Sequence, residues 1–432
     1  MRALIACAAA AVLLVLAGCG DDDASSGAGA GSGAQTGDAE VIDPALADSA
    51  TGEVRYCTGK DTSGAQKASV RAFNRRFGDE GLKAKLVEFP ESADAQRTQF
   101  IQRQQAKSPD CDVFYSDVIW TAEFASQNWL YDLTPVVEAR RDEFIPSTLE
   151  TIRYDGRYWG LPKQTDAGFL YYRTDQVKDL PKTWQGVYDV AERKDGIVYQ
   201  GARYEGLTVD FLELAFANGG RVLSEDGKSS EINSAENREA LQVMAQGIRS
   251  GAAPRAVVTY MEEQARREFQ GGRATFMRNW PYAYALAKRK GSDIRDRFAV
   301  APLPAFEGGS TAGVLGGHNL VISVHSDNPG GALRLVQYLT SSEAMERDAA
   351  KYSLAPTLRR TYSDPDVRDA LPFASELEQA VEQARSRPVT PVYPQVSQAI
   401  YENVYRALTG EMSPQDALAQ ADSDIEDALD TF

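Results

Sequence analysis

Histidine is nearly absent from this chain of 432 residues, which carries only two, His318 and His325. The chain therefore offers few histidines for a multi-histidine zinc site or for a Ser-His-Asp triad. A phosphate-binding loop is incomplete as well, because Val222 stands where Gly227-Lys228-Ser229 would need the first glycine of that motif. We expect no metal, no cofactor and no enzymatic reaction, although the abundant carboxylates leave a glycosidase with paired acids open.

Positive charge is also scarce relative to negative charge. The chain has 46 lysine and arginine residues against 62 aspartate and glutamate residues, a formal net charge of −16. This balance argues against nucleic acid as a partner and against adhesion to an anionic membrane face. No long apolar run follows the first 18 residues, so we expect one soluble body, and the length favours two lobes over one core.

The amino terminus has the pattern of an export signal. Arg2 precedes an apolar run over residues 3–16, which is too short for a permanent membrane span. Leu16-Ala17-Gly18-Cys19 resembles the lipobox of bacterial lipoproteins, in which the signal is cut before a cysteine that receives lipid. We expect a signal peptide at 1–18, a lipidated Cys19, and a flexible Gly/Ala/Ser/Asp-rich tether at 19–52 that holds the protein outside the cell membrane.

Two cysteines remain for the folded part once Cys7 leaves with the signal and Cys19 is lipidated. Cys57 and Cys111 stand in an oxidising compartment, where such a pair is expected to form a disulfide. Each is in or beside a predicted strand, and neighbouring parallel strands would bring the two together. The alternative is two free thiols.

From residue 53 onward, short β-branched and aromatic runs alternate with amphipathic helical stretches, which indicates an α/β fold. The predicted strands are 53–58, 84–89, 112–116, 168–173, 273–277, 297–302 and 319–324.

Two carboxylates stand at positions that suit a binding cleft. Asp117 follows the predicted strand 112–116, at the carboxyl end where ligands bind in parallel sheets. It also suits the cap of a following helix, and both roles can hold together. Asp166 precedes Ala167 and Gly168, a sequence that suits a hinge carrying an acid into a cleft, with an ordinary turn as the alternative.

Aromatic, glycine and arginine positions complete a pattern that suits a polyol, which offers apolar C–H faces to rings and hydroxyls to planar polar groups. Pro281 interrupts the chain between Trp280 and Tyr282 and favours rings that face a ligand over rings in the core. Gly317 lets a ligand approach the backbone. Arg387, stiffened by following prolines, presents five donors to hydroxyls or carboxylates, although a lone surface arginine would be unremarkable.

Taken in order, these segments resemble the extracellular solute-binding proteins, family 1, of ABC sugar importers, and most closely the trehalose/maltose-binding branch. The motifs that carry the resemblance are RYEGL at 203–207, FANGG at 216–220, ENREALQ at 236–242, FQGGRATFMRNWPYAY at 269–284, PLP at 302–304 and RPVTPVYPQVSQ at 387–398.

The resemblance implies a two-lobed, periplasmic-binding-protein-like fold of type II with a hinge between the lobes. One lobe would hold 53–163 and 318–355, and the other 167–313 and 360–432. Hinges would lie near Gln164–Ala167, Leu315–Gly317 and Ala355–Thr357.

The resemblance also implies a set of ligand contacts, Gly317 through its backbone. They are Arg97, Asp117, Gln164, Asp166, Trp280, Tyr282, Gly317, His318 and Arg387. Two of them depart from the sugar-binding relatives, because His318 replaces a tryptophan and Gln164 a tyrosine. Polar groups in place of ring faces favour a different or more polar glycan than trehalose or maltose, although His318 also suits simple packing.

The function expected from this resemblance is capture of a di- or oligosaccharide between the lobes. The monomeric receptor would close on the sugar and deliver it to a membrane permease driven by a separate ATPase. An exported glycosidase that uses Asp117 and Asp166 as its acid pair remains an alternative. A receptor for another polar solute, such as a peptide, an osmolyte or a partner protein, is the third possibility.

Overall fold

The computed structural model describes residues 39–431. The predicted signal peptide at 1–18, the predicted lipid site Cys19 and tether residues 19–38 lie outside the described residues. Within 39–431, no helix has both the length and the apolar character needed to cross a membrane.

A five-stranded sheet with the order β2-β1-β3-β11-β6 organises the first part of the fold. Its strands are β1 (Gly52–Thr58), β2 (Leu82–Glu88), β3 (Val113–Asp117), β6 (Leu161–Asp166) and β11 (Gly316–Ile322). β1 runs parallel to β2 and β3, whereas β11 runs antiparallel to β3 and β6. Apolar residues of β1, β3 and β11 are buried with those of neighbouring helices, which gives this sheet its own core.

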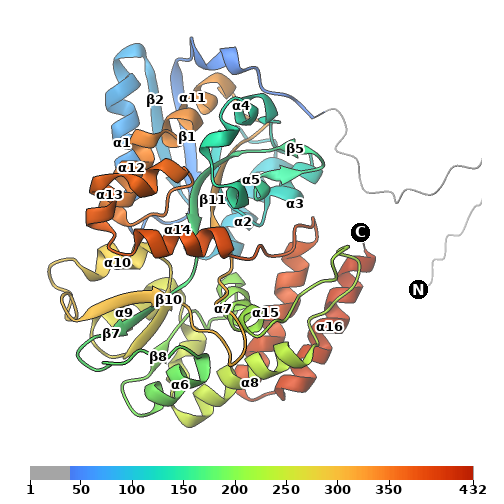
Figure 1. Cartoon of the computed structure of the whole chain (residues 1–432). Helices are drawn as coiled ribbons and strands as arrows, with labels where there is room; N and C mark the ends of the chain where they lie inside the picture. Colours follow the sequence, from blue (N-terminus) through green and yellow to red (C-terminus); the bar gives the residue numbers. More distant parts are fainter. Residues whose placement is uncertain (1–38, 432) are drawn as a thin grey trace, which may run out of the picture. The chain divides into compact units, whose positions relative to one another are not determined.

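The helices of this part include α1 and α11, which Figure 1 shows beside β1 and β2. They are α1 (Ala65–Phe77), α2 (Ala93–Gln105), α3 (Thr121–Ser126), α4 (Thr134–Glu138), α5 (Pro146–Glu150), α11 (Pro329–Leu339) and α12 (Ser342–Tyr352), with a hairpin of β4 (Arg153–Tyr154) and β5 (Arg157–Tyr158). Side-chain oxygens cap several of them: Ser92 accepts from the Ala95 amide at α2, and Asn328 accepts from the Gly331 amide at α11.

A four-stranded sheet with the order β10-β7-β9-β8 organises the second part. Its strands are β7 (Phe169–Arg173), β8 (Ile197–Val198), β9 (Phe276–Asn279) and β10 (Phe298–Pro302). Its helices are α6 (Trp184–Glu192), α7 (Glu205–Ala217), α8 (Ala235–Ser250), α9 (Glu262–Gln270), α10 (Tyr282–Ala287), α14 (Ala374–Gln383), α15 (Tyr393–Thr409) and α16 (Pro414–Asp430), whereas α13 (Pro365–Ala370) lies against α12 of the first part. α7 is buried along its whole length, because α8 and α15 pack against it.

Each of the seven predicted strands overlaps an observed strand. The largest offsets are at 273–277, where β9 begins only at Phe276, and at 319–324, where β11 already begins at Gly316. The predicted strands omit β6, whose sequence LPKQTD reads as polar although all six residues are buried. Its polar side chains are buried because each face of the strand meets polar partners.

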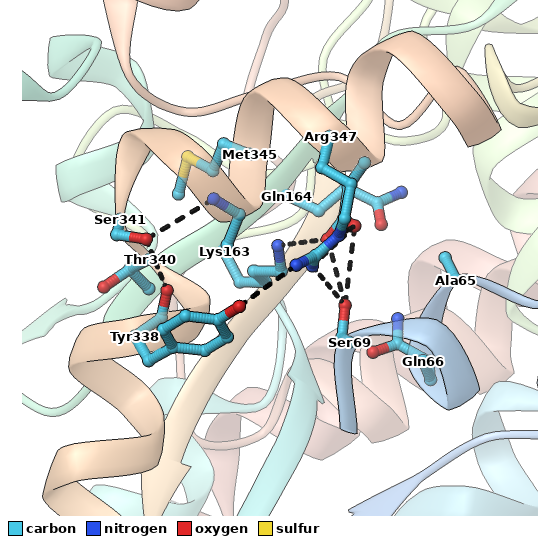
Figure 2. Close-up of polar contacts among 12 residues, drawn as sticks. Ala65, Gln66, Ser69, Lys163, Gln164, Tyr338, Thr340, Ser341, Met345 and Arg347 are labelled. Carbon is cyan, nitrogen blue, oxygen red and sulfur yellow. Dashed lines mark hydrogen bonds and ion pairs between the residues drawn. The ribbon is translucent and has the colours of Figure 1, made fainter. Parts of the chain in front are cut away.

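Lys163 on one face of β6 lies in a buried cluster with α1 and α12. Its Nζ donates to Asp348 Oδ2 at 2.7 Å, and the other carboxylate oxygen pairs with Arg347 Nη2 at 2.8 Å. Figure 2 shows Lys163, Arg347 and Ser69 converging, with Ser69 Oγ accepting from Arg347 Nη2 at 2.8 Å. Because side chains alternate along a strand, Gln164 and Asp166 lie on the opposite face from Lys163.

Ala167 and Gly168 are the only residues between β6 in the first sheet and β7 in the second. A Cβ atom built on Gly168 would lie 2.2 Å from Glu213 Oε1, so the crossing passes directly against a buried side chain. Glycine is needed at this position for space.

The tether expected over 19–52 is wrong from about Val41 onward. Ile42 is buried in the core of the first sheet, and its amide donates to Asp132 O at 3.1 Å. A short 3-10 helix at Pro44–Ala47 follows and contacts α11. The Gly- and Ser-rich composition of the whole stretch hid these few apolar residues at its end.

The structure joins Cys57 and Cys111 in a disulfide, with Cα atoms 5.8 Å apart. The parallel pairing of β1 with β3 sets Cys57 opposite Phe114, three residues beyond Cys111. Both cysteines are fully buried beside Phe100 and Phe114. The bridge therefore links the two strands at the edge of this aromatic cluster.

Removing the disulfide with the double substitution Cys57→Ala and Cys111→Ala should lower the free energy of unfolding. The bridge closes a loop with a sequence separation of 54 residues, for which the chain-entropy relation gives about 4 kcal/mol. Urea denaturation of the non-reduced wild type and the variant measures the difference. Coincident unfolding curves would contradict a stabilising bridge.

Candidate functional site

A cavity of about 190 Å³ is lined by elements that belong to both sheets. The first sheet contributes the ends of β3, β6 and β11, and the second part contributes α7, α9 and the turn from β9 into α10. A second cavity of about 160 Å³ adjoins the first. The residues that line both are Lys60, Thr62, Gln96, Gln164, Tyr282 and His318.

The structure brings eight of the nine predicted contact residues to this cavity. They are Asp117, Gln164, Asp166, Trp280, Tyr282, Gly317, His318 and Arg387. Asp117 and Arg387, which are 270 positions apart in the chain, thus meet because the segment at Arg387 returns to the sheet that holds β3, β6 and β11.

Arg97 is the exception, and its predicted role is corrected here. Its guanidinium binds the carboxylate of Glu123 through two hydrogen bonds, the one from Nε measuring 2.6 Å. Gln96, the preceding residue of α2, faces the cavity instead. A helix turns about 100° per residue, so the prediction was off by one position on the helix face.

Several lining residues were not predicted, namely Lys60, Glu91, Ala93, Gln96, Trp120, Tyr204, Glu205, Gly206, Val209, Glu262, Glu263 and Gly316. Glu205 had a usable signal, because it stands in the RYEGL motif that carried the family resemblance. Glu262 and Glu263 lie in the first turn of α9, where acidic residues are common at any helix start. Their sequence pattern therefore gave no indication of a site.

Arg387 contacts three other segments of the site. It is 5% exposed, its Nη1 donates to Glu205 Oε1 at 2.6 Å, and its Nη2 donates to Leu315 O at 3.2 Å. Nη2 also pairs with Asp117 Oδ1 at 3.4 Å. Burial alone would lower the pKa of Arg387, but Asp117, Tyr393 and Glu205 raise it above the usual value. Its two terminal nitrogens thus bind carboxylates and a backbone carbonyl, while its buried Nε has no hydrogen-bond partner among residues 39–431.

Asp117 combines the two roles considered from sequence. Its Oδ1 accepts from the Ile119 amide at 3.2 Å, which stabilises the turn before α3, and the residue lines the cavity. Burial raises the pKa of Asp117, and the nearby Arg387 partly offsets this rise.

The floor of the cavity is a polar chain on β3, β6 and β11. The Tyr115 hydroxyl donates to Gln164 Oε1, and Gln164 Nε2 donates to Asp166 Oδ2 at 2.7 Å. The ring of His318 stacks on Tyr115 with centroids 4.0 Å apart and planes 4° apart. Since Tyr115 fixes the Gln164 amide by its oxygen, the amide nitrogen must face Asp166.

Burial changes the protonation of this floor. It raises the pKa of Asp166 to about 7. It lowers the pKa of His318 to about 3, with a further contribution from Arg387, so the imidazole is neutral at physiological pH. His318 both packs on Tyr115 and lines the cavity, so packing and site are not exclusive alternatives.

Two rings form another wall. Trp280 is partly buried and lines the cavity, while the Arg278 guanidinium lies 4.0 Å from the indole centroid. Arg278 is itself held by Asp210 at 2.9 Å and by Glu213. The Tyr282 hydroxyl donates to Glu263 Oε1 at 2.9 Å. The indole is therefore neither sealed in the core nor free, since a fixed cation supports it from the protein side.

Gly317 approaches the neighbouring strand closely. Its φ is +117°, and a Cβ there would lie 2.2 Å from Gln164 O. A side chain at this position would collide with β6.

Among residues 39–431, no group of three or more His, Cys, Asp or Glu side chains is arranged to hold a metal ion.

Comparison with known proteins identifies the family. The family model for bacterial extracellular solute-binding proteins matches residues 58–346, more than half of the chain. The chain belongs to this family. A probable ABC transporter-binding protein of Deinococcus radiodurans is 39% identical to this solute-binding protein over 359 residues, which cover 78% of the chain and 84% of the relative.

Solved structures agree with this assignment. Maltose-bound MalE3 of T. maritima superposes with a TM-score of 0.83 and 35% identity, covering 87% of this chain and 99% of its own. The GacH receptor of Streptomyces glaucescens has a TM-score of 0.78 at 22% identity, covers 88% of this chain and 99% of its own, and supports the fold alone. The predicted two-lobed α/β fold is thereby confirmed. The solute-binding protein belongs to a family of extracytoplasmic binding proteins rather than of enzymes.

Asp166 should make the stability of this solute-binding protein fall as the pH rises. Its pKa is about 7 in the folded state and about 3.9 in an unfolded chain, so the unfolded state releases the proton first. Across the window from about pH 4 to about pH 7, each pH unit should cost up to about 1.4 kcal/mol. Asp166→Asn should remove the contribution of Asp166 to this slope and leave that of Asp94, whose pKa burial raises to about 6. Urea denaturation of both proteins across the window measures the difference. Parallel pH profiles would contradict the assignment.

Proposed function

We propose that this solute-binding protein captures a di- or oligosaccharide between its two lobes and hands it unchanged to the permease of an ABC transporter. The observation that carries the proposal is the cavity in which Trp280 and Tyr282 offer rings while Asp117 and Asp166 offer carboxylates. A sugar needs apolar surface for its C–H faces and polar groups for its hydroxyls within one cleft.

Relatives support a sugar as the ligand. A maltotriose-binding protein of Pyrococcus abyssi is 25% identical over 319 residues, which cover 71% of this chain and 67% of the relative. The MalE3 structure described above holds maltose. Gln164 and His318 add polar groups to the floor of the cavity, which supports a more polar glycan than maltose.

The lobes of this proposal hold 53–163 with 318–355 and 167–313 with 360–432, and the hinges lie near Gln164–Ala167, Leu315–Gly317 and Ala355–Thr357. The direct step from β6 to β7 through Ala167 and Gly168 supports the first of these hinges.

Two contacts join the proposed lobes beside the cavity. Asp94 Oδ2 accepts from the Glu205 amide at 3.3 Å, and Arg387 pairs with Asp117 at 3.4 Å. A ligand that touches residues of both lobes would add to these contacts and favour closure, because it binds the closed form better than the open form. The receptor acts as a monomer, and a separate ATPase supplies the energy for transport.

Trp280→Ala should weaken sugar binding by about tenfold or more, because it removes ring contact with the sugar while leaving the core intact. The probe is whichever sugar gives the largest shift in a thermal-shift panel of mono- and disaccharides, and calorimetry measures its affinity. Trp129→Ala, which removes an indole outside the cavity, is the matched control. Equal affinities of wild type and Trp280→Ala would contradict the proposed site, and products in the recovered sugar would favour a glycosidase.

We further propose that Cys19 carries the lipid that anchors the protein, as its position after Leu16-Ala17-Gly18 suggests. Cys19→Ala should move the protein from the membrane fraction to the soluble extracytoplasmic fraction. Immunoblots of both fractions measure the change, and Cys7→Ala is the control that leaves the expected lipid site in place. An unchanged membrane fraction for Cys19→Ala would contradict lipidation.

A further inference from the structure

The cavity has many more acidic than basic side chains. The acidic residues that line it are Glu91, Asp117, Asp166, Glu205, Glu262 and Glu263, and the basic residues are Lys60 and Arg387. Charges that leave water need partners of opposite sign, because an unpaired buried charge is costly. Which of these carboxylates have such a partner therefore bears on what the cavity can hold.

Three of the six carboxylates are already paired. Arg387 forms ion pairs with Glu205 at 2.6 Å and with Asp117 at 3.4 Å, so two anions share its charge. Arg266 forms an ion pair with Glu263 at 2.7 Å. Lys60 is exposed at the rim of the cavity, where its charge also acts on Glu88.

Glu91, Asp166 and Glu262 form no ion pair with lysine or arginine in the part of the chain that the structure describes. Glu91 and Glu262 also repel one another, since the charge of Glu91 raises the pKa of Glu262 further after burial has raised it. Arg278 acts on Asp166 and Glu262 from beyond Trp280, but its direct partners are Asp210 and Glu213.

Asp166 has an open oxygen as well as an unpaired charge. It is 5% exposed, and its Oδ1 has no hydrogen-bond partner among residues 39–431, while Oδ2 accepts from Gln164. Gln164 is a neutral donor and leaves the charge uncompensated. Tyr115 holds Gln164 in place, so the carboxylate of Asp166, which lines the cavity, keeps a fixed position there.

We propose that the ligand is an aminated sugar whose ammonium group binds Asp166 Oδ1. This inference rests on the proposed function and names the class of sugar. An ammonium group brings three donors and one positive charge, which a hydroxyl cannot do. Glu91 and Glu262 add negative potential around it, and the rings of Trp280 and Tyr282 offer faces that attract a cation and pack against the sugar carbons.

The test compares sugars that differ only at one substituent. Glucose, glucosamine and N-acetylglucosamine, and the β-1,4-linked dimers of each, carry a hydroxyl, an ammonium or a neutral amide at the same carbon. Calorimetry on the full-length protein at neutral pH should give an affinity for the aminated form that is about tenfold higher than for its hydroxyl and acetylated counterparts. Added salt should weaken the binding of the aminated sugar more than the binding of the neutral sugars.

Two variants test whether Asp166 is the residue that gives the preference for the aminated sugar. Asp166→Asn, which keeps the shape, should reduce the preference for the aminated form to less than about threefold. Glu225→Gln removes one charge from a side chain that is 86% exposed and outside the cavity, and it should leave the preference unchanged.

The outcomes separate this inference from the proposed function. If neutral sugars bind as tightly as aminated ones in the wild type, the aminated class is wrong and sugar capture stands. A preference that persists in Asp166→Asn would overturn the role of Asp166. If no sugar of any form binds, both the proposed function and this inference fail.

Discussion

The site depends on one buried guanidinium. Arg387 reaches Glu205 at the start of α7, Asp117 at the end of β3 and the carbonyl of Leu315 just before β11. These three elements come from segments that are far apart in the chain, and although β3 and β11 are neighbours in one sheet, α7 comes from the second part of the fold. A planar group with five donors can satisfy all three at once, which a lysine could not do with the same geometry.

A second consequence of this arrangement is the local charge balance. Arg387, Arg278 and Arg266 form ion pairs with carboxylates of the protein itself. The remaining acids of the cavity are therefore held in place without being neutralised. Burial then raises the pKa of Asp166 and of Glu262. These buried acids therefore reduce the stability of the folded protein, as is common where a functional site stores unfavourable charge.

The sequence predicted the strands well, because β-branched and aromatic runs such as 112–116 or 169–173 are buried on both sides and read clearly. It failed at β6, where the buried partners of Lys163 and Gln164 come from α12 and β3 and are invisible to a local pattern. Most of the predicted site residues meet at the cavity, but on α2 it is Gln96 that lines the cavity and not the predicted Arg97. Helix phase depends on how α2 packs against the aromatic cluster of Phe100 and Phe114, and the spacing of residues in α2 alone did not fix it.

The two faces of β6 have different tasks: Lys163 meets Asp348 on one, and Gln164 with Asp166 forms the cavity floor on the other. An inserted or deleted residue within 161–166 would exchange the faces, turning an ammonium group into the cavity and an amide toward a buried carboxylate. Only replacement of side chains at constant length therefore leaves both faces of this strand in place.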